Sequence, residues 1–86
     1  MPSKSYELRV FQGRREVDAP NKLRDVLDLD DAHGTQRLLT GHLLAAAERA
    51  GVGRSQAHLF HLDVHEVRGE RAENRALFQF SVPVVA

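Results

Sequence analysis

The sequence predicts an α+β domain in which a small, mostly antiparallel sheet of three to four strands packs on one main helix. Three observations predict this class. Apolar and polar residues alternate near both ends of the chain, a long segment between them has helical spacing, and glycine or proline separates the segments. The expected order is β-(β)-α-α-β-β, and 86 residues leave room for a single domain spanning 1–86.

The first strand is predicted over residues 5–11. Its apolar residues Tyr6, Leu8 and Val10 alternate with charged ones, which is the period of a half-buried strand. A short return strand at residues 16–17 would close a hairpin with it, although only one apolar residue indicates this second strand.

A short helix is predicted next, ending at Leu29. Leu23, Val26 and Leu27 have helical spacing over about two turns. An acidic loop then leads to the main helix, and Asp30, Asp31 and Thr35 are all suitable N-cap residues for it.

The main helix is predicted over residues 35–50. Gly51 stands where a left-handed C-cap belongs, and Val52 is placed to pack back on the last turn. The residues that share the apolar face of this helix are Leu39, Leu43, Ala46, Ala47 and Ala50.

Two further strands are predicted over residues 57–67 and 75–85. In the first, the apolar row Phe60, Leu62, Val64 alternates with the polar row His61, Asp63, His65. If the apolar rows of both strands share a face, the numbers of opposite residues sum to an even number, such as 140 or 142. That register places Leu77 and Gln79 beside the polar row.

One helix covers only one face of a sheet, so we expect the other face, here called the open face, to bind a partner. Its mixture of apolar and polar residues is typical of a partner surface. An ordinary solvated face with scattered apolar residues has the same pattern. The candidate interface residues are Phe11, Leu59, His61, Asp63, His65, Leu77 and Gln79.

The sequence therefore predicts a small non-enzymatic interaction or accessory module that forms a homodimer, or binds another protein, through the open face or an edge strand. Pro83 supports an edge strand because proline cannot donate a hydrogen bond to a neighbouring strand. No catalytic motif accompanies the serines and histidines, and no cofactor is expected.

The alternative hypothesis is a metal or small-ligand site at a subunit interface around His61, Asp63 and His65. These residue types bind zinc or manganese. However, on a straight strand His61 and His65 begin about 13 Å apart, so a site would need ligands from a partner subunit or from a loop.

Composition narrows the remaining classes. The chain has 12 basic and 12 acidic residues, and this zero net charge argues against nucleic acid as a partner. It has no cysteine, which fits a reducing, cytoplasmic location. No apolar run is long enough to span a membrane, so no membrane contact is expected. The excess of arginine over lysine is typical of a bacterial protein from a GC-rich genome.

Overall fold

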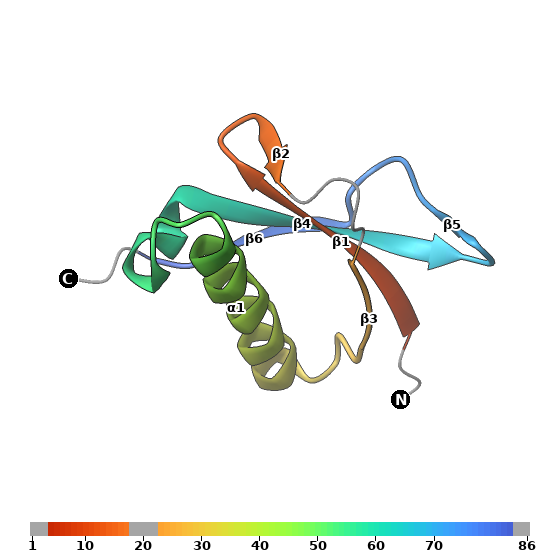
Figure 1. The fold of residues 1–86 in the computed structure, drawn as a ribbon. Coiled ribbons are helices and arrows are strands. Elements are labelled where there is room, and N and C mark those ends of the chain that lie inside the picture. Colours follow the sequence, from red (N-terminus) through yellow and green to blue (C-terminus); the bar gives the residue numbers. More distant parts are fainter. Residues whose placement is uncertain (1–3, 18–22, 84–86) are drawn as a thin grey trace.

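A computed structural model describes residues 4–17 and 23–83, and it confirms the predicted class: one main helix packs on a curled antiparallel sheet (Figure 1). The elements in chain order are β1 (Lys4–Gln12), β2 (Arg15–Val17), β3 (Leu23–Leu27), α1 (Ala32–Arg49), the 3₁₀-helix η1 (Arg54–Leu59), β4 (Phe60–Arg68), β5 (Arg71–Ala72) and β6 (Phe78–Ser81).

Strands β1 and β4 form the centre of the sheet. They pair antiparallel from Tyr6 opposite Glu66 to Gln12 opposite Phe60. On its other side, β1 pairs with β3 along its first half and with β2 at its end, which confirms the predicted hairpin. The other side of β4 pairs with β6 and β5. The sheet thus has a two-strand centre and two short strands along each margin.

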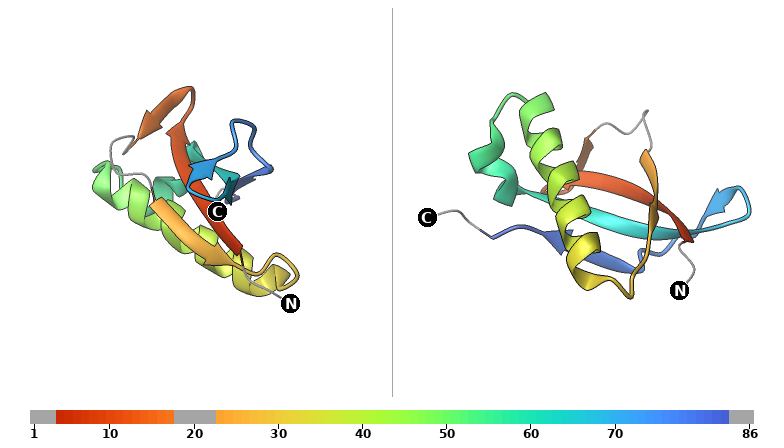
Figure 2. Two further views of the ribbon diagram at one scale, coloured as in Figure 1. Left: turned by 90° about the vertical axis from the view of Figure 1, so that its right-hand side faces the viewer. Right: turned by 90° about the horizontal axis from the view of Figure 1, so that it is seen from below.

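The core lies between α1 and one face of this sheet (Figure 2). Leu8 lies opposite Val64 and Val10 opposite Leu62, so alternate residues of the two central strands point toward the helix. The β4–β6 register pairs residue 62 with 80 and residue 64 with 78. The residue numbers sum to 142, so the structure confirms the expected even sum and selects one of the two values that the sequence left open. The fully buried side chains from the helix are Leu39, Leu43 and Ala47.

Helix α1 covers Ala32–Arg49, so it begins three residues before the predicted start at residue 35, and both of its ends are capped by residues that the sequence offered for this role. The Asp31 side chain accepts a hydrogen bond of 3.0 Å from the Gly34 N–H, so Asp31 is the N-cap among the three candidates. At the other end Gly51 has a φ of 81°, and the Val52 N–H donates to the Ala47 carbonyl. This Schellman geometry satisfies the last carbonyls and turns the chain toward η1. Within the described part of the chain, no helix is long and apolar enough to cross a membrane.

The predicted short helix before α1 is wrong, because Leu23–Leu27 forms strand β3. A run of five residues is too short for spacing to distinguish helix from strand. In the structure Leu27 is buried on the helix side, and Asp25 on the same side lies 3.2 Å from His42 of α1. Because Asp25 is polar although it faces the helix, the sequence of β3 does not show the alternation of apolar and polar residues that indicates a strand.

The predicted bounds of the last two strands need correction. Residues 54–59 form η1, so β4 begins at Phe60 rather than at Ala57. Strand β6 covers only Phe78–Ser81 of the predicted span 75–85. Residues 84 and 85 of that span lie outside the described residues.

We expect the single tyrosine to titrate late. Tyr6 is 4% exposed, and burial together with the negative charges of Glu66, Asp28 and Asp30 raises its pKa above the ordinary 10.0. The folded protein then holds the phenol proton where the unfolded chain has lost it, so stability falls as pH rises above about 10.

The absence of tryptophan lets ultraviolet absorbance report on this phenol alone. Alkaline titration of the native protein should show a later midpoint than titration in urea. Tyr6→Phe should lose less stability than the wild type between about pH 8 and about pH 11. Coincident native and denatured titrations would contradict this.

Candidate interaction surfaces

The open face is the sheet face that α1 does not cover, and an aromatic pair lies at one end of it. Phe11 of β1 lies directly opposite His61 of β4. The two rings stack with centroids 5.2 Å apart and planes 11° apart. Both side chains are only partly exposed, so the pair covers the end of the sheet near β2.

A short polar chain continues from this pair toward β6. The His61 Nε2 lies 3.8 Å from Asp63 Oδ1, and the same carboxylate oxygen accepts a 3.1 Å hydrogen bond from Gln79. Gln79 is exposed, whereas His61 and Asp63 are partly buried. The structure therefore brings together four of the predicted interface residues, Phe11, His61, Asp63 and Gln79.

The other half of the open face is covered, which the sequence did not predict. Glu7 is 2% exposed and His65, directly opposite it, is 4% exposed. The His65 Nδ1 donates to the Glu73 carbonyl over 2.8 Å, so the segment that follows β5 lies over this histidine. His65 is thus buried rather than available to a partner.

Glu7 is held by two arginines. Its carboxylate lies 2.7 Å from Arg9 Nη2 and 3.5 Å from Arg24 Nε. Arg24 also donates to the Glu70 carbonyl, which ties β3 to the β4–β5 turn. A polar hollow of about 480 Å³ lies beside this cluster. Its lining residues are Glu7, Arg9, Arg24, Glu70, Arg71, Ala72, Glu73 and Asn74.

The two predicted leucines of this surface lie outside the strands. Leu59 is the last residue of η1 and is 47% exposed. Leu77 precedes β6 and is 52% exposed, and its N–H donates to the Val64 carbonyl. Neither side chain is part of the aromatic pair or the polar chain described above.

The histidine and aspartate of the open face do not form a metal site in one chain. Among residues 4–17 and 23–83, no three His, Asp or Glu side chains group closely enough to hold a metal ion. His65 is engaged with Glu73, and Asp63 with Gln79. A metal site here would therefore need ligands from a second chain.

A second surface lies at the margin of the sheet, between α1 and β6. An apolar groove of about 290 Å³ runs between the first half of the helix and this strand. Figure 2 shows β6 as the outermost strand on this side, with α1 crossing the sheet beside it. The groove is lined by Leu29, Ala32, Thr35, Gln36, Leu39, Phe78 and Phe80, none of them charged.

Strand β6 differs from the other marginal strands in charge. Its sequence FQFS has no charged residue, whereas β2, β3 and β5 all contain arginine. Of the described strands only β4 pairs with it. The sequence carried a signal for the edge, since Pro83 cannot donate a hydrogen bond to a further strand, but the adjoining groove depends on where α1 lies.

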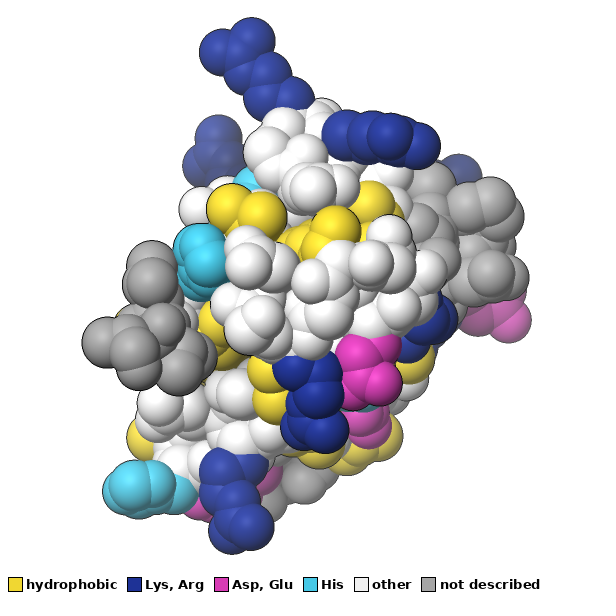
Figure 3. All heavy atoms as spheres, turned by 60° about the vertical axis from the view of Figure 1, so that its left-hand side comes forward, with side chains coloured by type: hydrophobic (Ala, Val, Ile, Leu, Met, Phe, Trp, Pro, Cys, Tyr) yellow, Lys and Arg dark blue, Asp and Glu magenta, His cyan; other side chains and the backbone are white. Residues whose placement is uncertain are grey.

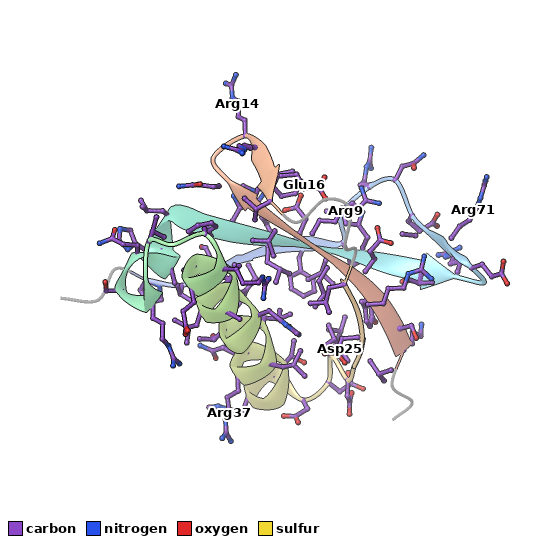
Figure 4. The ribbon with its side chains drawn as sticks, in the orientation of Figure 1. Arg9, Arg14, Glu16, Asp25, Arg37 and Arg71 are labelled. Carbon is purple, nitrogen blue, oxygen red and sulfur yellow. The ribbon has the colours of Figure 1, made fainter. Side chains whose placement is uncertain are left out.

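Several arginines lie apart from the hollow beside Glu7 or at its rim. Arg14, Arg37 and Arg71 point outward from the β1–β2 turn, from α1 and from β5 (Figure 4). On the face shown in Figure 3, Lys and Arg side chains are separated by uncharged surface and do not form a continuous patch.

Comparison of the chain with protein-family models, with curated proteins and with solved structures gave no match.

We expect the buried carboxylate of Glu7 to be a major contributor to stability. Glu7→Gln removes the buried charge that two arginines share and should lower the free energy of unfolding by about 1.5 to 2 kcal/mol, since both arginines are partly exposed and stay solvated. The matched control is Glu48→Gln, which breaks an exposed pair with Arg54 and should cost about 0.5 kcal/mol or less. Urea unfolding measures the free energy of unfolding of both variants. Equal losses of stability would contradict the major contribution of the buried Glu7 carboxylate.

Proposed function

We propose that this protein is a small non-enzymatic interaction module that binds an extended segment of polypeptide at the free edge of β6. The observation that carries the proposal is the combination of an uncharged edge strand with an apolar groove directly beside it. In strand addition, main-chain hydrogen bonds to an edge supply affinity, and pockets for alternate side chains supply selectivity.

The backbone of β6 supports this use. The Val64 and Glu66 carbonyls accept hydrogen bonds from the N–H groups of Leu77 and Glu73. The backbone N–H and C=O groups of the even-numbered residues of β4 therefore point toward the margin that β5 and β6 form. Phe78 lies opposite Val64, so the backbone N–H and C=O of Phe78 face β4 and form its hydrogen bonds with that strand. Since the pattern alternates along a strand, the N–H and C=O of Gln79 point to the free edge.

The side chains of β6 alternate in the same way. Phe78 and Phe80 line the groove on the helix side, and Gln79 lies on the open face. An added strand would place every second side chain against the groove. Because the groove lining has no charge, the bound segment is expected to have apolar residues at those positions.

The open face is the weaker candidate for binding. Half of it is closed by the segment after β5, and at the other end Phe11 and His61 stack on each other. No catalytic motif in the sequence supports an enzyme. The lack of cysteine is the observation that supports a cytoplasmic location.

A phage-displayed library of random peptides tests the proposal. Peptides selected on the wild type should be extended sequences with alternating apolar residues and no charge on the apolar row. Gln79→Pro removes the outward N–H and should abolish selection, because proline leaves the edge without its central donor.

Charge in the groove supplies a second variant with a matched control. Gln36 lines the groove and is exposed, so Gln36→Glu should weaken binding of a selected peptide by at least about fivefold. Gln56→Glu makes the same change at an exposed position on η1, outside the groove, and should bind as the wild type does. Equal binding by both variants would contradict the proposed site.

A further inference from the structure

We infer that the segment bound at the β6 edge is β6 of a second copy of this chain. The inference rests on the strand-addition function proposed above and names its partner. It predicts a two-fold dimer in which the two sheets join edge to edge and both helices lie on the same side of the continuous sheet.

The sequence of β6 has the side-chain pattern that a segment bound beside the α1–β6 groove needs. An occupant needs apolar residues on the helix side, polar residues on the other side and no charge. Phe78 and Phe80 supply the apolar row, and Gln79 and Ser81 supply the polar row. The other marginal strands carry charges at these spacings, for example Arg24 and Asp25 in β3.

Two-fold symmetry fixes the register. Two identical antiparallel strands related by an axis perpendicular to the sheet keep their faces aligned. With Gln79 opposite Gln79 of the partner subunit, the two outward N–H groups donate to the two outward carbonyls. Phe78 of one copy then lies opposite Phe80 of the partner subunit, on the side of the helices.

This register joins four phenylalanines into one row between the two grooves. Cross-strand aromatic pairs stabilise neighbouring strands. In a single chain the apolar lining of the groove, including the exposed Leu29, is accessible to water. Formation of the phenylalanine row would bury this lining.

The contact is small, which determines how it must be measured. A four-residue edge with a short groove has fewer residues than the roughly 20 on each side of a standard interface. We therefore expect a dissociation constant on the order of 10–100 µM. Association should be visible only when the protein is concentrated.

Sedimentation equilibrium between about 10 µM and about 500 µM brackets this affinity. The wild-type mass should rise with concentration from 9.6 kDa toward twice that value. Gln79→Pro should stay at the monomer mass at every concentration. Gln79→Ala, which keeps the backbone N–H, should associate far better than Gln79→Pro.

Folding of the variants is controlled in two ways. Far-ultraviolet circular dichroism and urea unfolding check Gln79→Pro. If that variant does not fold, Gln36→Glu replaces it, since position 36 is exposed on α1, and it should raise the dissociation constant at least about fivefold. Gln56→Glu remains the control.

Isotope-filtered NMR on a mixture of labelled and unlabelled protein tests the register. It should show contacts between Phe78 of one copy and Phe80 of the partner subunit. A wild type that stays monomeric at about 500 µM overturns the inference, whereas the peptide selection described above then decides separately whether β6 binds other chains. A dimer that persists in both Gln79→Pro and Gln36→Glu also overturns it, because the contact then lies elsewhere.

Discussion

The antiparallel pairing of β1 with β4 fixes the position of every surface in this protein. Both strands have neighbours on both sides, so their register cannot shift without turning each side chain to the other face. The pairing directs Leu8, Val10, Leu62 and Val64 toward α1. The same register places Glu7 opposite His65 and Phe11 opposite His61, which determines the chemistry of the opposite face.

The two faces of the central pair are closed by different means. Toward α1 the closure is apolar, and burial of leucine, valine and phenylalanine side chains stabilises it. On the other face the buried Glu7 carboxylate contacts arginines of β1 and β3, and the buried His65 imidazole donates to the Glu73 carbonyl, which holds the segment after β5 over this face. The accessible apolar lining of the α1–β6 groove lies on the helix side, at the margin of the sheet.

The predictions from sequence are correct where a hydrophobic pattern is long, or where local turn geometry determines the structure. The main helix with its Gly51 cap and the alternation in β1 and β4 follow from spacing and turn chemistry. The even parity of the β4–β6 register follows as well, whereas the choice of Asp31 among three N-cap candidates and of 142 over 140 needed the structure. Sequence reasoning failed at β3, where Asp25 faces inward because His42 of α1 lies 3.2 Å away. It also placed His65 on an accessible face, since burial of a histidine by a distant backbone carbonyl leaves no trace in local periodicity.

The contrast among the marginal strands is the step that joins fold to function. Unpaired strand edges present free N–H and C=O groups, and proteins commonly protect them with charge, with proline or by keeping them short. Strands β2, β3 and β5 are short and carry arginine. Strand β6 is equally short but uncharged, and the groove beside it has no charge either. Selection against edge pairing would place a charge in β6, where the exposed position 79 could hold one without disturbing the core. Glutamine at that position, between two phenylalanines that already bond to β4, leaves the edge able to pair.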